Sequence, residues 1–312
     1  MKLRSVISVR TAPAVLTGLI LAGLLTGCSV LRLNYARPAI ETYSIESEFI
    51  NIEINCPDCE IELLPTKTDK GRNVTATVVY RGNDETKHSV GVENGTLKIG
   101  HEKSGKGGIV IYSDKDEEIA VYLPEKEYLT LSIQSNSGSI IVPEDFSFEN
   151  VSLQTVSGQI QSSAEVGRTL LAQSASGSMR IEGTSTEYLE TYSKNGNVEI
   201  LNVSGNSAWA ETTSGNIMLR QAVFSDELNI ETTSGSVRFD DSDALIINVK
   251  TKSGNIKGTL LSKKVYQVSS ESGSVSLPAM SDNEITGGDG RDTYYGTCTI
   301  DTGSGTVDIK TK

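Results

Sequence analysis

Apolar and hydroxyl-bearing residues recur at a fixed short spacing from Leu131 to the C-terminus of this chain. Each repeat carries a Gly, in most repeats directly after Ser, and the stretch from Glu231 to Phe239 is representative. The recurring glycines are Gly138, Gly158, Gly177, Gly196, Gly215, Gly235, Gly254, Gly273 and Gly305. Their successive intervals are 20, 19, 19, 19, 20, 19, 19 and 32 residues. Such a period is typical of a solenoid made of one small unit that stacks on itself.

The positions around each Gly predict how one unit is built. The residues two after and seven before Gly are apolar in every repeat, and the residue five before it is mostly apolar. Even steps place these residues on one side of each strand, so we expect them to point into the core. A unit therefore contains a strand, a corner at the Ser-Gly pair, a second strand and a return loop. We attribute the Gly to a positive φ at the corner, which a residue with a Cβ adopts only at a cost.

The residue three before Gly bears a hydroxyl in every repeat. The series is Ser135, Thr155, Ser174, Ser193, Thr212, Thr232, Thr251, Ser270 and Thr302. The parity of this position makes it inward-facing where the strand meets the corner. Because an unpaired buried hydroxyl is costly, we predict a column of hydroxyls that bond to neighbouring coils or to the corner backbone.

These patterns predict an all-β fold, a single-stranded parallel β-solenoid (β-helix) with coils of 19–20 residues. A helix does not fit into a unit that already holds two strands, and right-handed winding is the default for parallel crossovers. We expect regular repeats over residues 131–312, with an insertion near residues 280–297, and less regular coils over residues 46–130. In the irregular part Cys59 takes the place of the repeat Gly, and Gly95 is predicted at another corner.

The N-terminus reads as a targeting segment. Lys2, Arg4 and Arg10 precede an apolar run from Ala12 to Leu25, which is typical of a signal peptide over residues 1–27. The run closes with Leu25-Thr26-Gly27-Cys28, which resembles a bacterial lipobox. That resemblance implies cleavage before Cys28, which would carry lipid on its sulfur and amine, followed by a tether over residues 28–45. The chain would then be exported, anchored to the bacterial membrane by its lipid and outside the cytoplasm; an uncleaved signal anchor is the alternative.

Net charge restricts the partners. The formal charge is −12, and loss of the three cationic residues of the signal peptide moves it to −15. Nucleic-acid binding depends on Lys and Arg that neutralise phosphates, so the charge argues against such a partner. An acidic body also repels anionic lipid, so the lipid on Cys28 rather than the protein surface is expected to hold the chain at the membrane.

The cysteines after Cys28 include one close pair, Cys56 and Cys59. Cys56 takes a place in the hydroxyl column and Cys59 the Gly corner of the first coil. Export permits a disulfide between them, which is the interpretation we favour; a pair of free thiols, a redox site or a metal site are the alternatives. Cys298 falls on an apolar position and is predicted in the core.

The corners Thr-x-Ser-Gly-x-[Ile/Val], such as Thr212 to Ile217, and the strand from Ile119 to Pro124 resemble a bacterial putative-adhesin family of unknown function. The match covers about residues 50–312. The resemblance implies a cell-surface β-solenoid that is adhesive or linked to envelope homeostasis. It carries over no catalytic residues.

A single Gly-rich stretch, Gly287 to Tyr294, matches a calcium-binding nonapeptide that contains Asp289 and Asp292. That motif works in tandem, because calcium needs oxygen ligands from more than one copy. We therefore interpret this single copy as a flexible loop, and we expect no metal and no cofactor.

Catalytic chemistry has few candidates here. His88 and His101 lie outside any recognisable motif, and the carboxylates Asp240, Asp241 and Asp243 fall on a return loop, where acidic residues favour turns. A polysaccharide-active β-helix enzyme is thus an alternative only.

Outward offsets on adjacent coils instead place Trp209, Tyr192 and Met218 as an apolar patch for a glycan or protein partner, against the alternative of scattered surface aromatics. We predict a non-enzymatic, adhesin-like surface lipoprotein that presents a binding face; a structural or sensory role in the envelope remains the other hypothesis.

Overall fold

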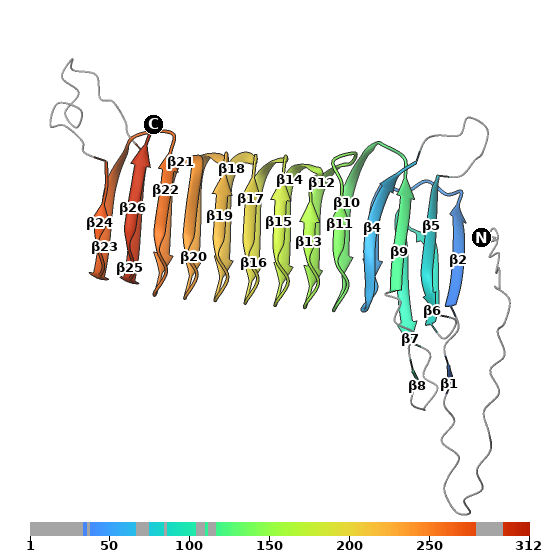
Figure 1. The fold of residues 1–312 in the computed structure, drawn as a ribbon. Coiled ribbons are helices and arrows are strands. Elements are labelled where there is room, and N and C mark those ends of the chain that lie inside the picture. Colours follow the sequence, from blue (N-terminus) through green and yellow to red (C-terminus); the bar gives the residue numbers. More distant parts are fainter. Residues whose placement is uncertain are drawn as a thin grey trace, which may run out of the picture.

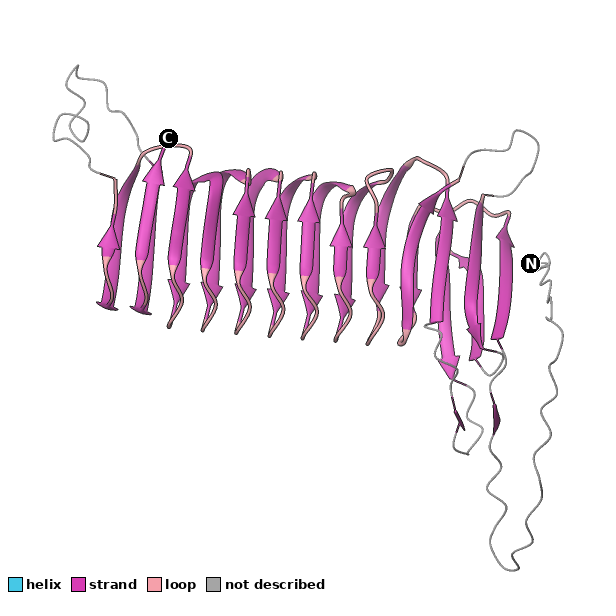
Figure 2. Ribbon diagram, viewed as in Figure 1, coloured by secondary structure: helices cyan, strands magenta, loops and turns pink. Residues whose placement is uncertain are grey.

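The computed structural model describes residues 34–35, 38–66, 75–83, 86–103, 110–111, 117–278 and 296–312. Strands stack side by side into a long rod, with the C-terminal coils at one end (Figure 1). The described part of the chain contains strands and loops and no helix (Figure 2), and hence no helix long and apolar enough to cross a membrane. The prediction of an all-β solenoid is confirmed; its handedness stays a prediction.

Two rows of parallel strands form the walls of the regular rod. The pre-corner sheet holds the strands before each Ser-Gly corner: β10 (Glu127–Gln134), β12 (Ser147–Thr155), β14 (Glu165–Ser174), β16 (Ser185–Ser193), β18 (Ser204–Thr212) and β20 (Val223–Thr232). The post-corner sheet holds the strands after it: β11 (Ile140–Val142), β13 (Ile160–Ser162), β15 (Met179–Glu182), β17 (Val198–Leu201), β19 (Ile217–Arg220) and β22 (Ile256–Leu260). Strand β21 (Val237–Thr251) runs through a return loop and pairs in both sheets.

Alternation along these strands fills the core as predicted. Leu170 pairs with Leu189 across β14 and β16, and Ile160 pairs with Met179 across β13 and β15; all four are buried. Like residues therefore stack on like positions from coil to coil. In the outermost C-terminal coil one of these apolar positions is not buried, because Val275 is exposed.

The corner glycines are required by close approach of successive coils, and our explanation by positive φ is wrong for all but one of them. Among the nine, only Gly273 has a positive φ, at 134°. A Cβ added to Gly235 would lie 1.6 Å from the carbonyl oxygen of Gly215, and one added to Gly177 would lie 1.7 Å from that of Gly158. A side chain at these positions would overlap the backbone of the neighbouring coil, so the glycines permit the stacking distance.

Seven of the nine hydroxyls in the column, from Ser135 to Thr251, bond to their corners as predicted, whereas the hydroxyl oxygens of Ser270 and Thr302 are buried and make no hydrogen bond to any described residue. Thr232 Oγ1 accepts a hydrogen bond from the backbone N–H of Gly235 at 3.0 Å, and Ser174 Oγ accepts one from Gly177 at 2.8 Å. Ser174 also donates to the carbonyl of Gly158 in the preceding coil at 3.4 Å. These hydroxyls satisfy the corner amides, and those that also donate to the preceding coil, as Ser174 does, join two coils.

At the N-terminal end the coils stack out of sequence order. The coil of β3 (Asn51–Asn55) and β4 (Cys59–Pro65) lies between the first regular coil and the strands β7 (Thr96–Lys103) and β9 (Glu117–Leu123). Beyond them the sheets turn antiparallel: β6 (Thr86–Glu93) pairs with β7, β5 (Ala76–Asn83) with β9, and β2 (Pro38–Ile45) with β5. The short strands β1 (Asn34–Tyr35) and β8 (Val110–Ile111) pair apart from the rod.

This arrangement corrects the prediction for Gly95. Asn94 and Gly95 both have positive φ, 50° and 75°, and they form the turn of the β6–β7 hairpin. Paired positive-φ residues are typical of two-residue hairpin loops. Leu97 pairs with Ile52, so it belongs to the pre-corner sheet and does not follow a corner. Cys59, in contrast, stands where predicted, because a Cβ on Gly138 would lie 1.6 Å from its carbonyl oxygen.

At the C-terminal end the coils again stack in an order that differs from their order in the sequence. The last coil in sequence, β25 (Gly296–Ser304) and β26 (Val307–Thr311), is inserted between the coil of β21 and β22 and the coil of β23 (Lys264–Ser272) and β24 (Val275–Ser276), as Figure 1 shows. The spatial order of the coils thus differs from their order in the sequence at both ends of the rod. The interval of 32 residues contains the connection that returns past one coil. Most of the predicted insertion near residues 280–297 lies outside the described residues.

Candidate binding faces of the rod

From β15 to β21 the outward side of the post-corner sheet carries paired charges. Arg180 contacts Glu182 at 2.8 Å and Glu199 at 2.9 Å, so it bridges neighbouring coils. Three coils beyond Arg180, Arg238 lies 2.9 Å from Asp240. Opposite charges in adjacent positions leave little net charge on this face, and exposed pairs of this kind contribute little to stability.

The outward side of the pre-corner sheet combines aromatic rings with carboxylates. Tyr192 donates a hydrogen bond from its hydroxyl to Glu190 at 3.1 Å on β16, and the Trp209 indole N–H donates to Glu211 at 3.4 Å on β18. The register of the two strands sets Glu190 beside Trp209 and Tyr192 beside Glu211. The four residues thus alternate, ring and carboxylate, in both directions; we name them the aromatic–carboxylate patch.

The carboxylates of the patch act on the ionisation of its tyrosine. The pKa of Tyr192 is raised above its ordinary value, first by desolvation and then by the negative charges of Glu190 and of Glu211. The rings also remain accessible, since Trp209 is 37% exposed and neighbouring Tyr188 is 47% exposed. A ligand can therefore reach both an aromatic surface and the carboxylates beside it.

The three residues of the predicted apolar patch lie on two different faces of the rod. Trp209 and Tyr192 share the pre-corner face, but Met218 lies on β19 in the post-corner sheet, paired with Glu199 and Arg238. Met218 therefore belongs to a different face. Sequence reasoning also missed Tyr188, although its even spacing from Tyr192 puts both on the outward side of β16. The parity of the strand was the signal that could have found it.

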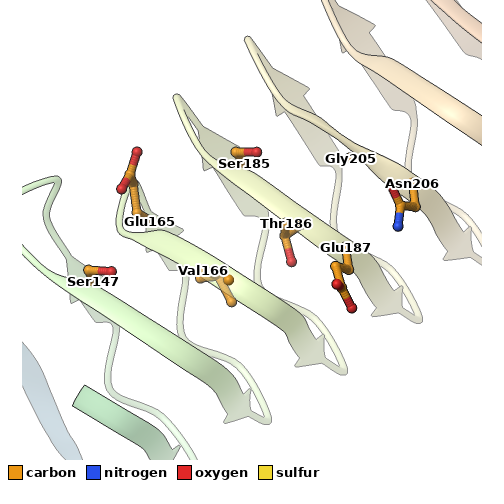
Figure 3. Close-up of a pocket in the computed structure, with 9 residues that line it drawn as sticks. Ser147, Glu165, Val166, Ser185, Thr186, Glu187, Gly205 and Asn206 are labelled. Atoms are coloured by element: carbon orange, nitrogen blue, oxygen red, sulfur yellow. The ribbon is translucent and has the colours of Figure 1, made fainter. Parts of the chain in front are cut away.

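A groove lies at the beginning of the same strands (Figure 3). It has a volume of about 380 Å³, and Figure 3 shows Glu165, Glu187 and Asn206 on successive coils around it. The groove forms where the pairing of β14 with β16 is incomplete, because that ladder starts only at Thr169 and Tyr188. Neighbouring ladders begin at the first residue of their strands.

Small residues and one hydroxyl shape this groove. Gly167 and Gly205 line it without side chains. The buried hydroxyl of Thr186 donates to the carbonyl of Arg168 at 3.1 Å and thereby satisfies a group that the open ladder leaves unpaired. The lining is mostly polar, so water or a small polar ligand suits it better than an apolar one.

The residues considered for catalysis are engaged elsewhere. Asp240 is paired with Arg238, Asp241 with Lys312 at 2.6 Å, and Asp243 with Lys264 at 2.7 Å. Carboxylates neutralised in this way do not form the unpaired set that polysaccharide cleavage needs.

Of the two histidines, only the side chain of His88 lies within the described residues. The His88 side chain is buried against Glu41 at 3.1 Å and against the ring of Tyr80. The side chain of His101 lies outside the described residues.

Of the remaining predicted sites, some lie within the residues that the structure describes and some lie outside them. A disulfide joins Cys56 and Cys59, whose Cα atoms are 5.5 Å apart. Cys298 is a buried free cysteine, and burial raises its pKa to about 12. Cys28, Asp289 and Asp292 lie outside the described residues. Within the described ranges, no group of three or more His, Cys, Asp or Glu residues could hold a metal ion.

The fold and its faces define a class: a β-solenoid rod with one ion-paired face and one aromatic, acidic face. The model of the family described as Toastrack DUF4097 matches residues 49–265, and this chain belongs to that family. A search of curated proteins gave no match.

Solved structures share the fold at low sequence identity. One is a "putative adhesin" from Parabacteroides merdae ATCC 43184, with a TM-score of 0.53, 14% identity, and coverage of 89% of this chain and 98% of that one. Another, from Parabacteroides distasonis ATCC 8503, is described as a "putative lipid binding protein", with a TM-score of 0.50, 16% identity, and coverage of 89% and 100%. Such low identity establishes similarity of fold alone.

Proposed function

We propose that this chain is a non-enzymatic, adhesin-like surface lipoprotein whose rigid solenoid presents the pre-corner face to a glycan or protein partner. The observation that carries the proposal is the aromatic–carboxylate patch, where partly exposed rings and carboxylates alternate on a parallel sheet. Aromatic side chains supply contact area at interfaces, and tethered polar tips hold them in place. Similar folds described as adhesins are consistent with this role.

The pre-corner face suits binding more than catalysis. Continuous parallel pairing from β10 to β20 makes the pre-corner sheet a stiff platform. A stiff platform orders few groups on binding, so little conformational entropy is lost. The ion pairs made by Asp240, Asp241 and Asp243 do not favour the polysaccharide-active alternative.

Adhesion of whole cells tests the proposal. Cells that display the full chain are expected to bind envelope material, host glycans or matrix proteins better than cells in which it is deleted. Tyr192→Ala with Trp209→Ala should abolish the difference, whereas Met218→Ala on the other face should preserve it. Equal adhesion of deleted and complemented cells to all these surfaces would refute the proposal.

Anchoring is tested separately. We propose that lipid on Cys28 holds the exported chain at the membrane, since the acidic body has no attraction for anionic lipid. Labelled palmitate should enter the full chain but not Cys28→Ala, and the variant should leave the membrane fraction. A membrane-bound, unlabelled chain would instead support an uncleaved signal anchor.

A further inference from the structure

The two faces of the rod differ in how their charges are compensated. On the pre-corner face Glu190, Glu211 and Glu227 form no ion pair with any described residue, and they instead accept hydrogen bonds from Tyr192, Trp209 and Asn248. Further along the same face Glu231 does have a cationic neighbour, Lys250 at 3.2 Å.

On the post-corner face the carboxylates Glu182, Glu199 and Asp240 each contact an arginine. Both faces belong to the same coils, so the contrast is a property of the pre-corner face and not of overall composition. Negative charge left unpaired in this way attracts a cationic partner.

The geometry of the patch further restricts which cationic group can bind there. Each ring has one carboxylate on its own strand, to which it is hydrogen-bonded, and a second on the neighbouring coil: Tyr192 lies between Glu190 and Glu211, and so does Trp209. The bonds at the ring edges restrain both rings, while the exposed part of Trp209 remains open to a ligand. A cation above either ring would thus meet a carboxylate on two sides.

A guanidinium group matches this arrangement best among common cationic groups. It is planar, stacks on aromatic faces and offers paired N–H donors to a carboxylate, whereas an ammonium acts as a compact, strongly hydrated charge. A neutral sugar could stack on the rings, but it would leave the negative charges uncompensated. Charge complementarity therefore favours a protein segment that carries arginine.

We propose that the aromatic–carboxylate patch binds arginine side chains of a protein partner, with the guanidinium stacked on Trp209 or Tyr192 and hydrogen-bonded to Glu190 or Glu211. The inference rests on the proposed function, because it names the partner of the same face. The groove along Glu187 and Asn206 continues the polar surface at the start of these strands and offers acceptors to the flanking peptide.

Calorimetric titration of the full, lipidated chain in neutral detergent tests the proposal. The probes are an oligoarginine peptide, an oligolysine peptide of equal length and a neutral oligosaccharide. Oligoarginine should bind several-fold more tightly than oligolysine, and the oligosaccharide should not compete. Trp209→Ala should weaken oligoarginine binding about tenfold, and Trp209→Tyr should recover most of the loss.

Matched variants distinguish binding at the patch from a general effect of the negative charge of the protein. Glu190→Gln with Glu211→Gln should weaken binding and reduce its salt dependence, whereas Glu182→Gln with Glu199→Gln removes the same charge from the other face and should change neither. Equal losses in the two double variants would overturn the proposal, as would equal binding of lysine and arginine peptides. If Trp209→Ala abolishes cell adhesion while oligoarginine does not bind, the proposed function stands and the arginine assignment fails.

Discussion

Lys264 Nζ lies 2.7 Å from Asp243 Oδ1, although the two residues belong to coils that are not neighbours. Lys264 is on β23 and Asp243 on β21, with β25 between them. Gly296 of β25 pairs with Lys264, and a Cβ on it would lie 3.0 Å from the ammonium nitrogen. The lysine side chain therefore passes over a residue without a side chain, and the ion pair joins the two coils that flank the inserted one.

Breaking this ion pair should be costly. The Lys264 side chain is 4% exposed and that of Asp243 12%, so Lys264→Met leaves a buried carboxylate without its partner. We expect a loss of about 3–5 kcal/mol of unfolding free energy, measured by urea denaturation. Asp243→Asn with Lys264→Met should recover part of that loss. Lys312→Met breaks the exposed pair with Asp241 and serves as control, with an expected cost below about 1 kcal/mol.

Corner glycines should tolerate no side chain. Gly235→Ala places a Cβ 1.6 Å from the Gly215 carbonyl oxygen, and relief of that overlap must separate two coils. The expected destabilisation is at least the roughly 1–3 kcal/mol typical of overpacking, measured by thermal unfolding. Gly91→Ala is the matched control, because a Cβ there meets nothing within 4 Å. Equal melting temperatures of the two variants would show that the close approach does not constrain the corner.

The hydroxyl column can be tested at Thr232. Thr232→Val keeps the shape but leaves the amide of Gly235 without its acceptor, which should cost about 1–3 kcal/mol of stability. Thr232→Ser keeps the oxygen and should retain most of the stability. Thr233→Val, at a neighbouring exposed side chain, controls for the exchange of threonine for valine itself. A loss in Thr232→Ser as large as in Thr232→Val would assign the effect to methyl packing.

Thiol accessibility tests the cysteine assignments. In the full chain with lipid on Cys28, a maleimide reagent should label no cysteine in the native state, because Cys298 is buried and its pKa is raised to about 12. Urea should expose that one thiol, and urea with reductant should expose three. The bridge between Cys56 and Cys59 is expected to stabilise the first coil by about 2 kcal/mol in the chain-entropy description. Three labelled thiols without reductant would exclude the bridge.

Acid should destabilise the N-terminal strands through His88. Burial lowers the pKa of His88 below its ordinary value of 6.5, and the hydrogen bond and charge of Glu41 only partly oppose this effect. Because the folded state has the lower pKa, this contribution to stability is complete above about pH 6.5 and is lost as the pH falls through the folded pKa. Urea midpoints at several pH values should show the loss, and His88→Gln should reduce it.

An NMR titration measures the same pKa directly. The chain has two histidines, so His101→Gln leaves a single imidazole signal. We expect a midpoint below pH 6.5; a midpoint above this value would mean that the interaction with Glu41 outweighs burial.

The sequence by itself determined the repeating unit. A period of 19 or 20 residues, with apolar residues at even steps and a hydroxyl three before each Gly, was sufficient to predict two strands and a corner per coil. It also placed Cys59 at a corner and Trp209 and Tyr192 on an outward face. These features follow from local chemistry, because alternation along a strand decides which side chains are buried.

The tertiary structure alone decided which coil lies next to which. Equal offsets make every coil an acceptable neighbour of every other, so the repeat carries no information on order. The order is set by particular contacts such as Lys264 with Asp243, and by strands that turn antiparallel beyond β9. Likewise, only the stacking distance explains the corner glycines, and only the division into two sheets separates Met218 from Trp209. Periodicity fixes what each coil buries, whereas contacts between distant residues fix how the coils assemble.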